Sequence, residues 1–218
     1  MKIRPILFST PMVQAILEGT KNQTRRIVKN NNSLYASKFS ELDFNDAFVE
    51  GFNISDKCLK AKHLINDTRQ LVLSKIETGD ILWVRETFIP PLGYGTINNY
   101  LYKTDYSNLR GAKWKPSIFM PKEACRIFLE VTIVRVERLQ EISNEDAKAE
   151  GIQNHYLLKD SGYTHYTRSD KFIPFGETDA EITSFLSLWI SINGAESLDA
   201  NPWVWVYDFK RVEKPKNF

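Results

Sequence analysis

One segment limits the possible folds more than any other. Residues 124–139, with the sequence ACRIFLEVTIVRVERL, alternate apolar and polar side chains over most of their length. Alternation has the period of a β-strand, in which successive side chains point to opposite faces of a sheet. The segment therefore predicts one long strand, or two strands joined by a bulge.

Shorter segments with β-like patterns lie on either side of this strand. Apolar or alternating runs bounded by turn residues predict strands at residues 3–8, 24–28, 81–88, 101–106 and 203–212.

Three helices are predicted between the strands. The first begins at Ser9-Thr10-Pro11, a capping hydroxyl ahead of a proline in the first turn, and ends at Gly19. A short second helix begins at the N-cap Ser143 and stops at Gly151. The third covers residues 178–192 and has an apolar face.

This order of elements predicts an α+β fold around a small β-barrel, flanked by helices, and not a parallel doubly wound sheet. With 218 residues, 42% of them hydrophobic, the chain can bury one sizeable core, so residues 1–218 are predicted to form a single domain. Residues 29–77 have few periodicities and are interpreted as an insertion, with amphipathic helices predicted at residues 39–48 and 58–73. Residues 154–177 are predicted to be rich in loops.

Composition narrows the choice of partners and compartment. There are 29 Lys and Arg residues against 27 Asp and Glu, and the net charge of +2 is too small to hold nucleic acid through the bulk field alone, so any anion site must be local. Only two cysteines occur, which predicts reduced thiols. With no 18-residue apolar run and no apparent signal peptide, we expect a soluble, cytoplasmic protein without a membrane partner.

The stretch GTKNQTRR, residues 19–26, follows the first predicted helix and concentrates cationic side chains. It suits a small cationic pocket for an anionic or polar ligand. It equally suits a solvated helix end, where basic side chains offset the helix dipole, with Thr24 placed only as a good strand former. The residues themselves leave both interpretations open.

The same stretch resembles the G-x-K-x-x-x-x-R signature of the ASCH domain, a relative of the RNA-binding PUA domains, with Gly19, Lys21 and Arg26 at the signature positions. Four further blocks resemble longer bacterial and phage-type ASCH proteins in the same order: GDILWVRETF, WKPSIFMP, RVERLQEISNEDAKAEGI and NPWVWVYDF. The resemblance implies a PUA-like barrel with a cleft beside the first helix, and RNA or a modified nucleoside as the ligand.

The resemblance also implies an activity. A much shorter relative is an N4-acetylcytidine amidohydrolase whose motif is a lysine, a threonine three residues later and a glutamate in a later helix. Lys21, Thr24 and Glu150 match these positions, and another relative is a ribonuclease. By this interpretation Thr24 attacks the acetyl carbonyl, Lys21 accepts its proton and Glu150 protonates the departing nitrogen.

Other side chains are candidates for substrate binding. Besides Gly19, these are Arg25 and Arg26, which would hold the substrate or steady a developing oxyanion. Glu86 is a reserve acid on a predicted strand, and Trp114 lies in a basic loop where its ring could stack on a base, although such tryptophans are more often packing residues.

No cofactor is expected. The three histidines are scattered, no Cys/His pair has ligand spacing, and neither a phosphate loop nor a dinucleotide turn occurs, so neither a metal nor a nucleotide cofactor is predicted.

Two classes of function remain: a module that binds RNA or a modified nucleoside, and a hydrolase or ribonuclease that uses the same cleft. The oligomeric state is not predicted. Amide hydrolysis requires Lys21, Thr24 and Glu150 to converge on one point, whereas binding does not.

Overall fold

The computed structural model describes residues 1–28, 47–53, 58–63, 69–91, 99–106, 108–156, 161–168 and 172–218. The strands are β1 (Ile3–Leu7), β2 (Gln23–Ile27), β3 (Ala47–Asn53), β4 (Cys58–His63), β5 (Arg69–Leu73), β6 (Ile81–Arg85), β7 (Phe88–Ile89), β8 (Leu101–Tyr102), β9 (Phe128–Arg138), β10 (Asn154–Tyr156), β11 (Ser161–Thr164), β12 (Phe172–Pro174) and β13 (Trp203–Val212). The α-helices are α1 (Thr10–Glu18), α2 (Asn144–Ala149), α3 (Ala180–Asn193) and α4 (Glu196–Asp199), and the 3-10 helices are η2 (Ser117–Phe119), η3 (Lys122–Ala124) and η4 (Leu139–Glu141).

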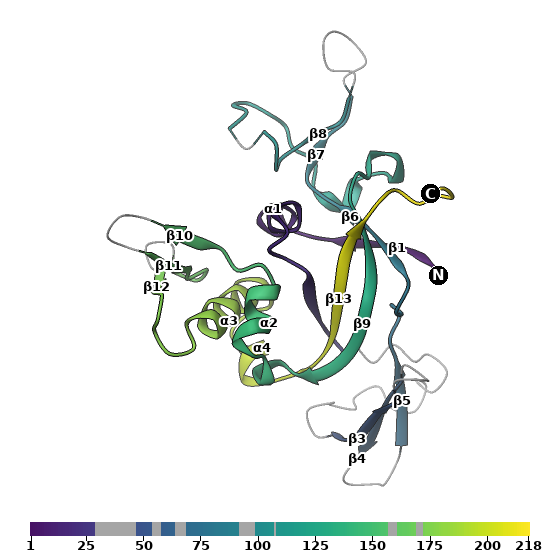
Figure 1. Cartoon of the computed structure of the whole chain (residues 1–218), viewed down its shortest axis with the longest axis vertical. Helices are drawn as coiled ribbons and strands as arrows, with labels where there is room; N and C mark the ends of the chain where they lie inside the picture. The colour runs from purple at the N-terminus through teal and green to yellow at the C-terminus, as the bar shows by residue number, and fades with distance from the viewer. Residues whose placement is uncertain are drawn as a thin grey trace.

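A five-stranded sheet in the order β1-β6-β9-β13-β2 organises the molecule (Figure 1). β1 and β6 are parallel, and the other neighbouring pairs are antiparallel. The three-stranded sheet β3-β4-β5 and the hairpin β7-β8 project from opposite ends of the molecule, and β10-β11-β12 form a separate small sheet.

The predicted long strand is confirmed as β9, which pairs with β13 along the length of both. The register shifts where Asp208 opposes Ile133 and Phe209 opposes Val131, so Thr132 is the extra residue of a bulge. Val131 is buried, Ile133 is exposed, and Val134 is buried again. The bulge therefore resets the alternation and lets both halves of β9 face a core.

Three hydrophobic cores pack against the main sheet, and the third contains Ile81 of β6, Phe128 of β9 and Met120. The first joins α1, through Val13 and Ile16, to the sheet residues around Trp205 and Tyr207. The second joins α2 and α3 to Val204 and Val206, which alternate with those residues along β13. Successive side chains of β13 thus belong to different cores, and the charged residues of β2 are placed between them.

The predicted helices are confirmed, with one difference at α1. Its Ser9 makes no side-chain capping bond, although Pro11 lies in the first turn and Gly19 ends the helix. In α2 the Ser143 hydroxyl accepts a hydrogen bond from the Asp146 N–H at 3.1 Å, as the capping pattern predicts.

The expected α+β class is confirmed, but the sheet is not closed into a barrel. Among the described strands, no backbone pairing joins the edge strands β1 and β2. The main sheet therefore has a seam between these two edges.

Two expectations for local structure are wrong. The helix predicted at residues 58–73 is wrong, because residues 58–63 and 69–73 pair as the antiparallel strands β4 and β5, in line with the alternation in CLKAKH. The strand expected at residues 101–106 ends after Tyr102, because the N–H groups of Asp105 and Tyr106 donate back to the Tyr102 carbonyl and form a turn. The helix predicted at residues 39–48 lies mostly outside the described residues.

No helix in the described ranges combines the length and apolar character needed to cross a membrane.

Candidate functional site

Main-chain hydrogen bonds hold the loop after α1 in place. Gly19 has a φ of 79°, which reverses the chain at the end of the helix. The Lys21 N–H then donates to the Ala15 carbonyl at 3.1 Å, and Lys21 forms an isolated antiparallel bridge with Glu150, directly after α2. Backbone structure thus brings Lys21 and Glu150 together, as the sequence resemblance implied.

Gly151 makes this close approach possible. Its φ is 76°, and a Cβ atom at this position would lie 2.6 Å from the Lys21 Cβ and 2.9 Å from the Ala15 Cβ. Both contacts are with short, fixed side-chain atoms, so neither can move away cheaply. Only glycine lets the end of α2 pack directly against the loop that carries Lys21.

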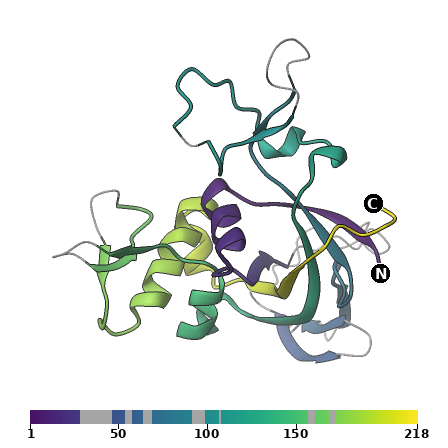
Figure 2. The same cartoon turned by 45° about the horizontal axis from the view of Figure 1, so that its top comes forward.

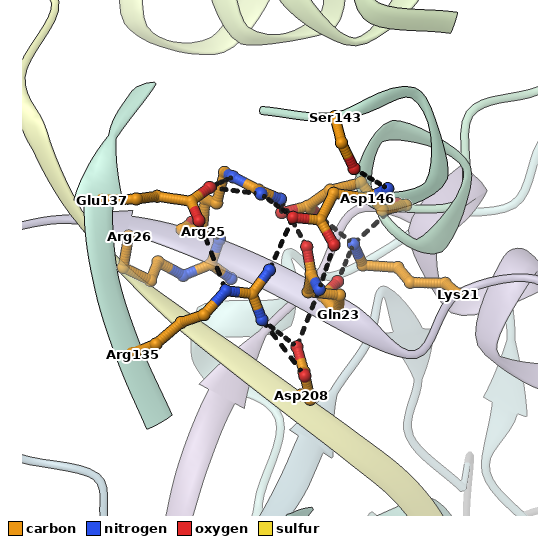
Figure 3. Close-up of polar contacts among 10 residues, drawn as sticks. Lys21, Gln23, Arg25, Arg26, Arg135, Glu137, Ser143, Asp146 and Asp208 are labelled. Carbon is orange, nitrogen blue, oxygen red and sulfur yellow. Dashed lines mark hydrogen bonds and ion pairs between the residues drawn. The ribbon is translucent and has the colours of Figure 1, made fainter. Parts of the chain in front are cut away.

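The Lys21 ammonium is fully buried and has a partner for each of its three donors. It donates to the Gln23 carbonyl at 2.7 Å, to the Glu150 carbonyl at 2.7 Å and to the Glu150 carboxylate at 2.8 Å (Figure 3). Burial lowers the pKa of Lys21 from its ordinary value, and the Glu150 carboxylate opposes that shift. A lysine in this position gives up its proton more readily than an exposed one.

Arg25 binds the same carboxylate from the other side. Its buried guanidinium donates to Glu137 from Nε and Nη2, to Asp146 at 2.9 Å, to the Gln23 side chain, and to Glu150 at 3.2 Å. These contacts use all five N–H groups of the arginine. Although Arg25 was predicted to bind substrate, its donors are committed to orienting the surrounding acids.

Arg135 extends this network to the neighbouring strands. It pairs with Asp146 at 2.6 Å, with Asp208 at 3.0 Å and with Glu137 at 3.3 Å. Burial opposes ionisation of Asp146, but hydrogen bonds from Gln23 and Arg135 outweigh it and hold the pKa of Asp146 below its ordinary value. We call these residues the charge network: Lys21, Gln23, Arg25, Arg135, Glu137, Asp146, Glu150 and Asp208.

A cleft of about 730 Å³ opens above the Glu150 end of the charge network. Its volume falls within the range of roughly 300–1,000 Å³ that is common for small-molecule sites. The lining is mainly apolar, and it comes from β1 and the start of α1, from β2, from α3, from η2, from the residue after α2 and from two residues near β6: Pro5, Ile6, Leu7, Phe8, Ser9, Met12, Arg25, Arg26, Ile27, Ile76, Thr87, Ser117, Glu150, Phe185, Leu188, Trp189, Ile192 and Asn193.

The cleft lies at the seam of the sheet, because it is lined by both edge strands, β1 and β2. Arg26 crosses this seam: its guanidinium donates to the Leu7 carbonyl of β1 at 3.1 Å and to the Arg25 carbonyl of β2 at 3.1 Å. The guanidinium carbon also lies 5.4 Å from the centre of the Phe8 ring. Among the described contacts, three of its five N–H groups have no protein partner, so they are available to a ligand.

Thr24, the third predicted catalytic residue, and Gly19, predicted to bind substrate, lie elsewhere. Thr24 is 1% exposed and pairs in register with Tyr207, on the face of β2 that packs into the first core. Among the described hydrogen bonds, none joins its side chain to Lys21 or Glu150, and neither Thr24 nor Lys21 lines the cleft. Gly19 shapes the end of α1 and does not line the cleft either.

Glu86 and Trp114 also lie away from the cleft lining. Glu86 is buried, accepts two hydrogen bonds from Arg126 at 2.9 and 3.0 Å, and accepts another from the Thr104 hydroxyl at 3.0 Å. Its carboxylate fastens the segment after β8 to the end of β6. Trp114 is half-buried in that same segment, next to Lys115.

No group of three or more His, Cys, Asp or Glu side chains is arranged to hold a metal ion in the described part of the chain.

The sequence interpretation missed most of the charge network. Arg135 and Glu137 are two residues apart on β9, as Gln23 and Arg25 are on β2, so each pair shares one face of its strand. One signal in the sequence could have revealed the network. Polar or charged residues occupy alternate positions on strands whose partner residues, Val204 and Val206, are buried. Comparisons of the chain with protein-family models, with curated proteins and with solved structures found no match.

Proposed function

We propose that the chain is an ASCH-like, PUA-like protein whose seam cleft binds an unpaired nucleobase of RNA or of a modified nucleoside. The observation that carries the proposal is the position of Arg26, with three donors available beside a cleft that also contains the Glu150 carboxylate. The absence of backbone pairing between β1 and β2 leaves this space between the edges of an otherwise continuous sheet.

The lining matches the chemistry of a base. A nucleobase has flat apolar faces and a polar edge with both donors and acceptors. Met12, Leu188 and Trp189 supply apolar surface, the Arg26 guanidinium donates to ring nitrogens or carbonyls, and the Glu150 carboxylate accepts from an exocyclic amino group. Arg25 is neutralised by its acids, so Arg26 is the lining cation best able to attract a phosphate.

The proposal is tested by calorimetric titration with cytidine, N4-acetylcytidine, uridine and adenosine. Arg26→Ala should weaken the tightest of these complexes by about 10-fold or more, because hydrogen bonds from charged groups contribute about 1.5–3 kcal/mol each. Arg211→Ala removes an exposed arginine of β13 outside the cleft and should leave affinity unchanged. Absence of binding by the parent protein, or equal affinity for both variants, would refute the proposal.

A second candidate is hydrolysis of an N4-acyl amide, favoured by the buried contact of 2.8 Å between Lys21 and the Glu150 carboxylate. In that reaction the Thr24 oxygen bonds to the acyl carbon and its proton passes to neutral Lys21. The proton then passes from Lys21 to Glu150, which delivers it to the nitrogen as the C–N bond breaks, and water hydrolyses the acyl-threonine to release the acid and regenerate Thr24. Burial, which lowers the pKa of Lys21, supports its use as a base.

This second candidate requires rearrangement, since Thr24 has no hydrogen bond to Lys21 in the described contacts. Acetate release from N4-acetylcytidine should be lost in Thr24→Val, and Lys148→Ala is a control at an exposed lysine of α2. Incubation with single-stranded RNA in parallel detects ribonuclease cleavage. Turnover that survives Thr24→Val would rule out the covalent mechanism, while nucleoside binding without turnover would leave only the binding function.

A further inference from the structure

One wall of the cleft continues into a segment of unusual composition, residues 103–106 and 108–119, which we call the basic arm. Ser117 of this arm lines the cleft, as do residues of α3. Within the described arm there are four basic residues, Lys103, Arg110, Lys113 and Lys115, and one acid, Asp105. The arm has a net charge of +3, whereas the whole chain has +2, so positive charge is concentrated in this segment of the chain.

The basic arm also exposes apolar side chains. Tyr106, Leu109, Ile118 and Phe119 are 47%, 44%, 57% and 68% exposed, and all four basic residues are exposed as well. Ile118 and Phe119 directly follow the cleft residue Ser117 and belong with it to η2. Among the cleft residues, Leu7 and Ile192 are 44% and 58% exposed, so exposed apolar groups lie on both sides of the opening.

Hydrogen bonds hold the base of the arm, whose backbone is drawn in teal in Figure 2. Lys115 exchanges backbone hydrogen bonds with Phe88 at 2.8 and 3.2 Å, and Arg85 donates to the Ile118 carbonyl. Met120, directly after Phe119, is 1% exposed and packs in the third core. Because the base of the arm is already held by these contacts, a ligand that binds to it loses little of its affinity to ordering the protein.

Glu86 and Arg126 fasten the other end of the arm. Arg126 binds Glu86 and Asp105, and its guanidinium carbon lies 3.9 Å from the centre of the Tyr102 ring. The only acid of the described arm, Asp105, is therefore paired with a residue outside the arm. The exposed lysines Lys113 and Lys115 have no ion pair among the described residues.

Exposed aromatic and aliphatic groups among unpaired cations match single-stranded nucleic acid: its bases stack on such groups, and its phosphates require positive charge. We propose that the ligand of the cleft is one nucleotide of a single strand, whose neighbouring nucleotides stack on Phe119 and Ile118 while Lys113 and Lys115 hold the phosphates. This inference rests on the proposed function, and it specifies a polymer as the substrate class. A duplex does not fit, because its bases are already stacked and paired.

The experiment measures fluorescence anisotropy with a labelled mononucleotide, trinucleotide and hexanucleotide of one sequence, as RNA and as DNA, and with a duplex of the hexanucleotide. Affinity should rise from mononucleotide to hexanucleotide and be weak for the duplex. Phe119→Ala should weaken hexanucleotide binding by about 5- to 150-fold, the range for loss of one stacked base, and leave mononucleotide binding unchanged. Phe175→Ala, at a half-exposed ring in the loop after β12, is the aromatic control.

The charge contribution is measured separately. Replacing Lys113 and Lys115 together by Ala should make the plot of log affinity against log salt shallower by about 1.4, since each single-strand phosphate contact contributes about 0.7. Lys216→Ala, at an exposed lysine near the C-terminus, should not change the slope. Circular dichroism of each variant separates misfolding from loss of contact, and the lysine pair gives an independent readout if Phe119→Ala is unstable.

The outcomes separate this inference from the proposed function. One outcome is that Arg26→Ala weakens mononucleotide binding while longer strands bind no more tightly than the mononucleotide. This outcome would overturn the role of the arm and leave the cleft function intact. Hexanucleotide binding that depends on Phe119 but not on Arg26 would overturn the cleft function. Failure of every oligonucleotide to bind, or equal binding of the duplex, would overturn the single-strand assignment.

Discussion

Replacing Glu150 by glutamine is the most direct perturbation of the charge network. The substitution keeps the shape of the side chain but removes its charge, and it turns one carboxylate oxygen into an N–H donor. That carboxylate is 5% exposed and faces Lys21 at 2.8 Å and Arg25 at 3.2 Å, both of which have fully buried side chains. Either orientation of the new amide would direct a donor at one of these cations.

The expected loss follows from this geometry. Removing one partner of a buried ion pair costs about 3–5 kcal/mol, because the opposite charge stays buried without compensation. Arg25 retains Glu137 and Asp146, and Lys21 retains two carbonyl partners, so we expect Glu150→Gln to lie near the lower limit, at about 3 kcal/mol. For a chain of this length, that corresponds to a fall in Tm of roughly 6–12 °C.

Urea unfolding followed by tryptophan fluorescence measures the loss. The matched control is Glu130→Gln, the same substitution in a Glu–Lys pair whose Glu130 and Lys210 side chains are 35% and 62% exposed, with an expected change of at most about 0.5 kcal/mol. Adding Lys21→Met to Glu150→Gln removes the uncompensated ammonium and should restore part of the stability. If the two glutamine variants lose equal stability, the network is not the buried, mutually compensated set of charges described above.

Three further predictions concern the same region and its supports. Gly151→Ala should be strongly destabilising because its Cβ would clash with Lys21, whereas Gly176→Ala, with a φ of 85° and open space around it, should show only the backbone strain; equal melting temperatures would contradict the close packing. Arg25→Lys should cost about 1–3 kcal/mol in urea unfolding, because an ammonium has three donors for five buried contacts; a neutral result would contradict their importance. Burial disfavours ionised Asp80, but its hydrogen bonds hold its pKa below the ordinary value. Its contribution to the free energy of unfolding is therefore present above about pH 4 and lost as pH falls through the lowered pKa. Asp80→Asn should reduce the loss of stability in acid, and an unchanged profile of stability against pH would contradict this.

The fold could be predicted from sequence where one face of an element is buried. β9, β13 and α3 have side-chain periodicities that match their structure, because the cores impose those periods. The helix wrongly predicted at residues 58–73 had no such long pattern, and its two strands are short. Absence of barrel closure could not be predicted, since pairing between β1 and β2 depends on where distant segments place two edges.

The candidate site could be predicted only in part, and from a different kind of information. The contact between Lys21 and Glu150, residues 129 positions apart, came from a resemblance and not from any local pattern. The commitment of all five Arg25 donors could not be foreseen either, because its partners Glu137 and Asp146 lie on β9 and α2, far along the chain. Sequence reasoning identified which residue types were suited to a polar site, and the fold determined which of them remain available to a ligand.

The structure separates two roles among neighbouring arginines, and this separation supports the proposed binding cleft. Arg25 and Arg26 point to opposite faces of β2 because a strand alternates. Arg25 meets three acids and stabilises the packing of α2 against the sheet, while Arg26 meets mainly backbone carbonyls and an aromatic ring across the seam. Carbonyl partners carry no net negative charge, so Arg26 has no direct ion pair among the described residues; burial lowers its pKa, and the Glu150 carboxylate opposes that shift. In a largely apolar cleft, its donors would contribute most to an anionic or carbonyl-bearing ligand.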